Sequence, residues 1–95
     1  MAEKSSQSWT IRVSSKAEKY FAKLGASTKS AIKTELTLLS SHENPLQHPD
    51  ARPLVGPFKG MYRLRVGKYR VIFTMLATER IIAVVNIAPR GDAYK

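Results

Sequence analysis

Residues 61–75 alternate between apolar and polar side chains, and this pattern constrains the fold more than any other feature of the chain. Side chains two positions apart along a strand lie on the same face of a sheet. The segments "MYRLRV" (61–66) and "YRVIFTM" (69–75) therefore predict two strands that each bury one face. In the link "VGK", Gly67 is free to take the positive φ of a tight hairpin turn. A slip of one residue would bury arginine side chains, so burial fixes the register.

The other face of this predicted strand pair is basic. Arg63 and Arg65 alternate with the apolar residues of the first strand, and Arg70 does so in the second, so we expect all three guanidinium groups on the open face of the sheet. No Asp or Glu occurs from residue 51 to residue 78, a stretch of 28 residues. Guanidinium groups present paired donors that match phosphate oxygens, and they stay charged at physiological pH. The pattern is typical of a phosphodiester site, but an exposed sheet face also carries basic residues for solubility and edge protection.

Two amphipathic segments before the strand pair predict a helical hairpin. In "SSKAEKYFAKLG" (14–25) the apolar side chains share one helical stripe, formed by Ala17, Tyr20, Phe21 and Leu24. Ser15 and Glu18 have the spacing of a capping box, and Gly25 marks the end of this helix. A second helix is predicted from residue 27 to residue 41, with its inward face formed by Ile32, Leu36 and Leu39.

The remaining segments complete the predicted fold. The segment "WTIRV" (9–13) and the apolar run at 81–87 predict two more strands, the second ended by Pro89. Residues 42–59 are predicted to form an irregular connector, because they contain Pro45, Pro49, Pro53 and Pro57. The order β-α-α-β-β-β predicts one small α+β domain over residues 1–95. It has an N-terminal strand, a helical hairpin and a three-stranded antiparallel meander, with the helices on one sheet face.

Composition points to an anionic partner. The chain has 16 Lys and Arg against 7 Asp and Glu, and the net charge of +9 favours nucleic acid, then a membrane surface, then an acidic protein. The absence of cysteine excludes disulfides and thiolate chemistry. Two histidines, His42 and His48, are too few for a zinc site of the usual nitrogen and sulfur type, and we expect both to be solvated connector residues. No metal or cofactor is expected.

The N-terminal segment predicts where the protein resides. "MAEKSSQSW" is polar and lacks the apolar core of a signal peptide. The longest apolar run, residues 81–85, is far too short to cross a bilayer. We therefore expect a soluble cytoplasmic protein that has no membrane partner.

The run "LVGPFKGMYRLRVGKYRVIF", the apolar strand after it and the closing "PRGDAYK" resemble the RelE family of the RelE/ParE toxin superfamily. The resemblance extends to the leading strand and the helical hairpin, and so implies a RelE-like fold. It implies a toxin of a type II toxin–antitoxin system, a ribosome-dependent endoribonuclease that cleaves mRNA in the A site of the 30S subunit. A ribose 2′-hydroxyl attacks its adjacent phosphate without a metal or small-molecule cofactor. The implied partners are a cognate RelB-like antitoxin, the ribosome and mRNA.

The resemblance also implies roles for single residues. Arg63 and Arg65 match the two basic strand residues of the RelE active site, and Arg70 matches the arginine that holds the scissile phosphate. Arg90 matches the residue proposed to protonate the leaving oxygen, and Tyr94 matches the tyrosine that stacks on or orients the base. Additional RNA contacts are expected from Lys59, Lys68 and Lys95.

Arg65 departs from some family members, which carry lysine at this position. Lysine can be tuned towards acting as a base, whereas arginine is scarcely ever deprotonated. We therefore expect Arg65 to stabilise charge, with the ribosomal RNA environment or another group taking the proton. The motif contains no His or Glu pair of the conventional acid–base kind.

Two other functions remain open from the sequence. The ParE branch of the superfamily poisons DNA gyrase and cuts no RNA, but that branch generally lacks the clustered strand arginines together with a terminal tyrosine. The third reading is an RNA- or ribosome-binding module without catalysis. Loss of cleavage with retained binding in Arg70→Ala and Arg90→Ala would distinguish the nuclease from this module.

Overall fold

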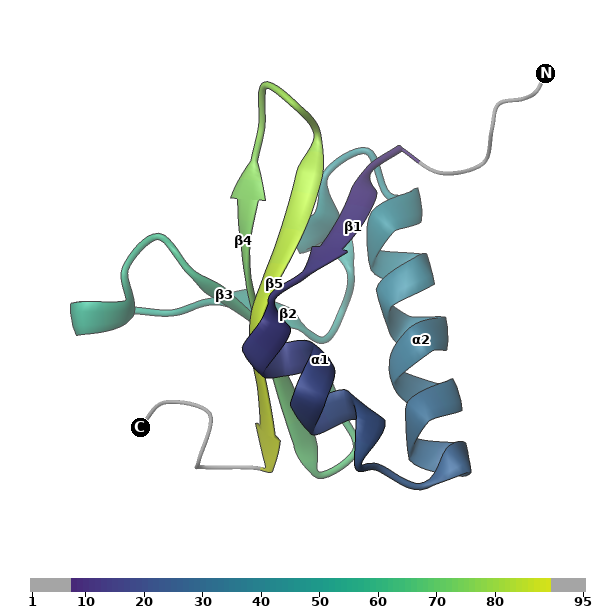
Figure 1. Ribbon diagram of the computed structural model, residues 1–95. Helices are drawn as coiled ribbons and strands as arrows, with labels where there is room; N and C mark the ends of the chain where they lie inside the picture. The colour runs from purple at the N-terminus through teal and green to yellow at the C-terminus, as the bar shows by residue number, and fades with distance from the viewer. Residues whose placement is uncertain (1–7, 90–95) are drawn as a thin grey trace, which may run out of the picture.

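The computed structural model describes residues 8–89, which form a five-stranded sheet with two helices packed against it (Figure 1). The helices are α1 (Ser15–Ala22) and α2 (Ala26–Ser41). The strands are β1 (Thr10–Val13), β2 (Ala51–Pro53), β3 (Tyr62–Val66), β4 (Tyr69–Leu76) and β5 (Ile81–Pro89). Their order in the sheet is β1-β5-β4-β3-β2, and β1 runs parallel to β5 while the other pairs are antiparallel. The predicted α+β class, the helical hairpin and the meander of β3, β4 and β5 are confirmed.

The connector departs from its prediction as an irregular segment. It contains the short edge strand β2 and two 3₁₀ helices, η1 (Pro45–Gln47) and η2 (Gly56–Phe58). The prolines do not prevent this structure, because an edge strand tolerates proline and the first positions of a helix need no amide hydrogen. Within β2, Ala51 pairs with Leu64 of β3 and is almost completely buried.

Helix α1 begins one residue away from the predicted cap. Ser14 is the N-cap, and its Oγ accepts a hydrogen bond from the amide of Ala17 at 3.1 Å. The same hydroxyl donates to the carbonyl of Val85 in β5 at 3.1 Å. The predicted capping box of Ser15 and Glu18 is therefore wrong, because Ser14 both caps the helix and ties its start to the sheet.

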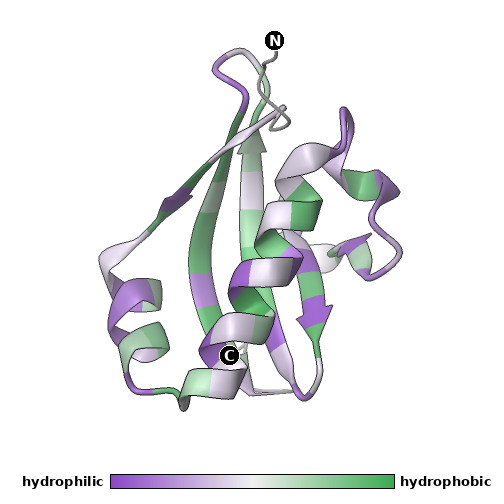
Figure 2. Cartoon of the chain, turned by 90° about the vertical axis from the view of Figure 1, so that its right-hand side faces the viewer, coloured by the Kyte–Doolittle hydropathy of each residue, from purple (hydrophilic) through white to green (hydrophobic). Residues whose placement is uncertain are grey.

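The main core lies between the helices and one face of the sheet. Its completely buried side chains include Ile32 and Leu39 of α2 and Leu64, Val71 and Phe73 of the central strands. The predicted inward stripes of both helices pack against this cluster, with Ala17 and Ile32 completely buried. Figure 2 shows apolar segments along the central strands and on the helix that covers them.

A second, smaller cluster lies on the opposite face of the sheet. Ile72 is 3% exposed and Ala88 is 9% exposed, and Leu54, Met61 and Val85 pack against them. The register of β4 and β5 shifts between Ile72 and Phe73, as in a β-bulge. The face predicted to be open is therefore partly covered by the residues on either side of η2.

No helix among residues 8–89 has the length and apolar character needed to cross a membrane.

Candidate functional site

The hairpin of β3 and β4 brings the three predicted arginines onto one face of the sheet. Arg65 lies directly across from Arg70, and Arg63 lies across from Ile72. On its other side Arg63 pairs with Arg52 of β2. Cationic side chains directly opposite each other on a sheet repel, so the pairing of Arg65 with Arg70 opposes folding unless an anion relieves it.

Arg70 has buried donors without a partner among residues 8–89. Its Nε and Nη1 atoms are shielded from solvent, and neither has a hydrogen-bond partner in the part of the chain that the structure describes. A buried donor without a partner costs about 1–3 kcal/mol, and more when the group is charged. Such a group is rare in folded proteins and indicates a functional role or an absent ligand. Nε and one Nη are the paired donors that a guanidinium offers to a phosphate.

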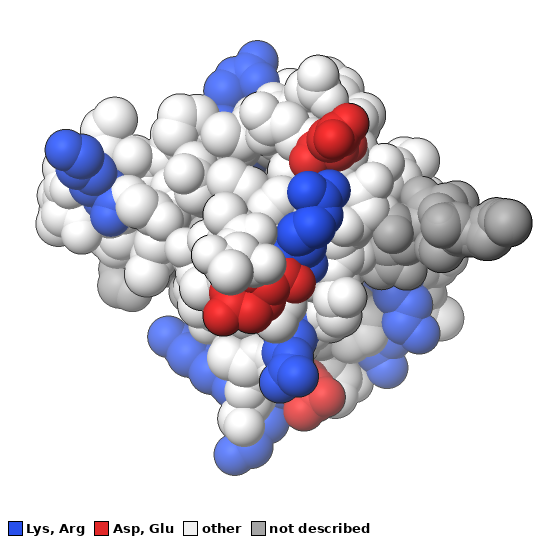
Figure 3. All heavy atoms as spheres, turned by 90° about the horizontal axis from the view of Figure 1, so that it is seen from above, with Lys and Arg blue, Asp and Glu red and all other residues white. Residues whose placement is uncertain are grey.

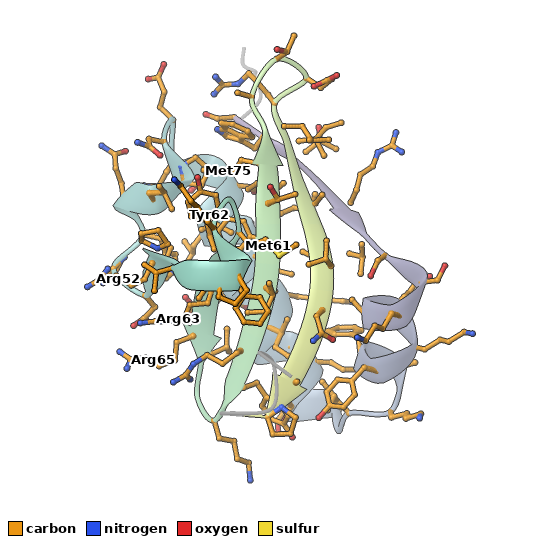
Figure 4. All side chains as sticks on the ribbon, turned by 90° about the vertical axis from the view of Figure 1, so that its left-hand side faces the viewer. Arg52, Met61, Tyr62, Arg63, Arg65 and Met75 are labelled. Atoms are coloured by element: carbon orange, nitrogen blue, oxygen red, sulfur yellow. The ribbon has the colours of Figure 1, made fainter. Side chains whose placement is uncertain are left out.

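Arg63 and Arg65 instead contact Asp50, which directly precedes β2. Nη2 of Arg65 donates to the Asp50 carboxylate at 3.0 Å, and Nη1 of Arg63 donates to the Asp50 carbonyl at 3.0 Å. The side chains of Arg65 and Asp50 are 52% and 38% exposed, so their ion pair is well solvated. Figure 4 shows Arg63 and Arg65 directed towards the β2 side of the sheet, together with Arg52. Because β2 and β4 lie on opposite sides of β3, the contacts with Asp50 draw both guanidinium groups towards β2 rather than towards β4.

Asp50 is itself held by a buried histidine. The Asp50 amide donates to Nδ1 of His48 at 3.0 Å, and Nε2 of His48 lies 2.9 Å from the Glu35 carboxylate of α2. Because Nδ1 accepts a hydrogen bond, the ring proton is on Nε2 and is donated to Glu35. His48 is only 3% exposed, so the prediction of a solvated residue is wrong: the connector folds back onto α2 and buries the ring.

The sequence did not identify Glu35, His48 and Asp50 as parts of this site. One signal was present for Asp50, which is the last acidic residue before the acid-free stretch. No signal indicated His48, because a histidine among prolines is usually a solvated loop residue. Arg52 was also overlooked, and its Nη1 donates to the carbonyls of Pro49 and Ala51, each at 3.0 Å.

Two of the three lysines predicted to contact RNA, Lys59 and Lys68, lie among the described residues, and both are outside the strands. Lys59 is exposed directly after η2, beside a hollow lined by Leu54, Val55 and Met61. Lys68 is exposed in the turn between β3 and β4, beside the first turn of α2. Their predicted RNA contacts remain predictions. Three further predicted site residues lie outside residues 8–89, namely Arg90, Tyr94 and Lys95.

Acidic side chains are absent from strands β2, β3 and β4 but occur elsewhere on the described surface. Figure 3 views the molecule from above, onto the end with the turn between β4 and β5, and shows acidic side chains among basic ones there. The acid-free stretch from residue 51 to residue 78 contains all of β2, β3 and β4. Across residues 8–89 no three side chains of His, Cys, Asp or Glu form a group suited to a metal ion. What the described site offers chemically is therefore guanidinium donors for an anion.

Comparisons with known proteins agree with this fold. The family described as the ParE toxin of type II toxin–antitoxin system, parDE, matches residues 11–94. A candidate toxin, RelE1 of Methanocaldococcus jannaschii, is 34% identical over 64 residues, which cover 67% of this chain and 70% of the relative.

Solved structures share the same architecture. The archaeal RelE–RelB complex of Pyrococcus horikoshii aligns with a TM-score of 0.73 and 24% identity, covering 90% of this chain and 99% of the matched one. The toxin–antitoxin complex RelBE2 of Mycobacterium tuberculosis aligns with a TM-score of 0.70 and 20% identity, covering 86% and 98%. The family match over most of the sequence thus agrees with the geometry, and the chain belongs to the ParE toxin family of type II toxin–antitoxin systems, within the RelE/ParE toxin superfamily.

Proposed function

We propose that this toxin is a ribosome-dependent endoribonuclease that cleaves mRNA in the ribosomal A site and thereby inhibits translation. The observation that carries the proposal is Arg70, whose Nε and Nη1 are buried and unpaired within the described chain. Arg65 lies across the strand pair from it, and no acidic residue lies in β2, β3 or β4. A phosphodiester supplies the negative charge and the acceptor oxygens that Arg70 lacks among the described residues.

In the proposed reaction, a ribose 2′-oxygen attacks the adjacent phosphorus while the bond from phosphorus to the 5′-oxygen breaks. The products are a 2′,3′-cyclic phosphate and a free 5′-hydroxyl. Arg70 binds the non-bridging oxygens, and Arg63 and Arg65 stabilise the negative charge that accumulates on the phosphate. The 2′-hydroxyl proton passes to a base in the ribosomal RNA environment or to another group. Arg90 is assigned to donate a proton to the leaving 5′-oxygen.

Dependence on the ribosome fits the acid–base groups available in the described chain. His48 is buried, and both of its ring nitrogens are engaged, by Glu35 and by the Asp50 amide. It is therefore not placed to act as the general base at the arginine face. An enzyme without a strong base of its own gains most from a particle that orients its substrate, and orientation alone is worth about 7–11 kcal/mol in favourable cases.

A cognate RelB-like antitoxin is the proposed partner in the resting state, and the cytoplasm is the proposed location. The structures of the P. horikoshii and M. tuberculosis relatives are complexes of a toxin with its antitoxin. The net charge of +9 favours an acidic partner that masks the basic face.

The proposal is tested by mapping cuts in mRNA on translating ribosomes with purified protein. The wild-type chain should cut within the A-site codon, and Arg70→Ala should slow cleavage by about 10²–10³-fold, the usual effect of removing one transition-state donor. Arg12→Ala is the matched control, because it removes the same charge from an exposed position on β1 at the far side of the sheet. This control should cut normally.

Because the matching family is described as ParE toxin, the same experiment must also test for gyrase poisoning. Intact transcripts together with trapped complexes of gyrase and DNA would overturn the nuclease proposal in favour of a ParE-like gyrase poison. Unchanged transcripts with equal loss of ribosome binding in Arg70→Ala and Arg90→Ala would favour a non-catalytic binding module.

A further inference from the structure

Asp50 occupies the donors of two candidate site arginines. Its carboxylate accepts from Nη2 of Arg65 at 3.0 Å. Its carbonyl accepts from Nη1 of Arg63 at 3.0 Å and from the Arg65 amide at 3.1 Å. One residue therefore presents several oxygen acceptors to adjacent arginines, which is also what a phosphodiester group does.

Hydrogen bonds to His48, which is itself bonded to Glu35 of α2, fix the position of Asp50. His48 accepts the Asp50 amide hydrogen and donates to Glu35, while the His48 carbonyl accepts from the Ala51 amide at 3.1 Å. The ring of His48 is 3% exposed and therefore has little freedom to move. Because α2 and the connector together hold this backbone, Asp50 lies beside β3 as part of the native fold.

We propose that Asp50 is an internal stand-in for the RNA phosphate, an inference that rests on the proposed function. In the free toxin the Asp50 carboxylate neutralises Arg65 and draws it towards β2, away from Arg70. When RNA binds, a phosphodiester replaces this carboxylate as the partner of Arg65. Arg65 then turns to the same anion that Arg70 holds, while the bond from Arg63 to the Asp50 carbonyl remains in place.

The exposure of the pair makes this exchange energetically accessible. Arg65 is 52% exposed and Asp50 is 38% exposed, and ion pairs this solvated contribute little to stability. A phosphodiester held jointly by Arg65 and Arg70 also relieves the repulsion between these directly opposed cations. Asp50 therefore competes with RNA for Arg65 without preventing binding.

The test measures binding separately from cleavage. A fluorescent single-stranded RNA with 2′-O-methyl groups, which lacks the attacking hydroxyl, is titrated with the full chain at low salt and followed by anisotropy. Asp50→Asn keeps the backbone, the size and the carbonyl contacts but removes the charge that holds Arg65. It should bind this RNA about three- to fivefold more tightly, the range expected for freeing one exposed ion pair.

Two controls separate the proposal from a general charge effect. Glu79→Gln makes the same change in net charge in the exposed turn between β4 and β5, at the other end of the sheet. It should tighten binding distinctly less than Asp50→Asn does. The second control repeats Asp50→Asn in an Arg65→Gln background, where the tightening should disappear because the competed arginine is absent.

Each result decides the inference. Tightening that is specific to Asp50→Asn and requires Arg65 supports it. The inference is overturned by unchanged or undetectable binding in both proteins, by tightening that equals that of Glu79→Gln or persists without Arg65, or by weaker binding in Asp50→Asn. If wild-type protein cuts mRNA on ribosomes while Asp50→Asn leaves RNA affinity unchanged, this inference alone fails. If Asp50→Asn tightens binding as expected but no protein cuts, the proposed function alone fails.

Discussion

Arg70, near the start of β4, and Arg80, in the turn that follows β4, have opposite environments. Arg80, in the turn after β4, stacks its guanidinium 4.9 Å from the centre of the Trp9 ring and donates from Nε to the Ser8 carbonyl at 2.9 Å. Arg70, at the start of β4, has buried Nε and Nη1 atoms without a partner among the described residues. Arg80 therefore links the β4–β5 turn to the N-terminal segment, whereas Arg70 has unsatisfied donors among the described residues.

The difference shows that the two ends of β4 satisfy their arginine donors to different degrees. At the Arg80 end, Trp9 is 7% exposed and its indole Nε1 donates to the Glu43 carbonyl at 2.9 Å. At the Arg70 end, like charges face each other across β3 and β4. Unsatisfied buried polar groups are rare in folded proteins and call for a functional explanation, and the ones found among the described residues belong to Arg70 of the candidate site.

We expect the largest effect on stability from substitution of Trp9, which contacts Arg80. Trp9→Ala should lower the free energy of unfolding by about 3–5 kcal/mol, because it removes a buried aromatic ring, its hydrogen bond to Glu43 and its contact with Arg80. Trp9→Phe keeps a ring for Arg80 and should cost distinctly less. Urea denaturation followed by circular dichroism measures both, and equal losses in the two variants would contradict the role given to the ring itself.

Substitution of His48 should have an intermediate effect on stability, because this side chain holds Asp50 in place beside the arginines. His48→Ala leaves the Asp50 amide without its acceptor and Glu35 without its donor, and we expect a loss of about 1–3 kcal/mol in the same urea measurement. His48→Asn retains an acceptor near the Nδ1 position and should lose less. A stability unchanged in His48→Ala would show that the buried ring is not needed to hold the connector.

Arg80 itself should contribute less, and its two substitutions should differ in a defined order. Its φ is +55°, a left-handed conformation that costs a side-chain-bearing residue about 1 kcal/mol or more. Arg80→Ala keeps this cost and loses the contacts with Trp9 and Ser8, so we expect a loss of about 1–2 kcal/mol. Arg80→Gly relieves the strain and should be the more stable of the two by thermal denaturation. The reverse order would contradict the assigned strain.

Arg70 should show the smallest effect on stability, with the opposite sign. Arg70→Met replaces unpaired donors with an apolar chain of similar length, so the free energy of unfolding should be unchanged or higher by up to about 1 kcal/mol. Urea denaturation at low and high salt measures this, because salt should narrow the difference by screening the repulsion from Arg65. A marked loss of stability in Arg70→Met would show that Arg70, like Arg80, stabilises the fold, and would contradict this prediction.

Much of the fold followed from local patterns, and the errors lie where local patterns compete. The alternation in 61–75 predicted β3, β4 and the shared face of the arginines, because burial of one face leaves a single register. The four prolines argued against a strand in the connector, yet the free edge of β3 was available and β2 pairs with it. Ser14 and Ser15 offered adjacent caps, and contact with Val85, distant in sequence, selected Ser14.

The sequence by itself determined the excess of positive charge, the acid-free stretch and the face on which the arginines emerge, because composition and the two-residue period of a strand are local properties. The tertiary structure decided which partners the arginines of residues 8–89 have. Asp50 reaches Arg65 across 15 residues of sequence, His48 reaches Glu35 across 13, and Arg80 reaches Ser8 across 72. These partners depend on the path of the connector and the order of the strands. Asp50 pairs with Arg65, while Nε and Nη1 of Arg70 stay buried without a partner among the described residues, and no local pattern in the sequence could show this difference.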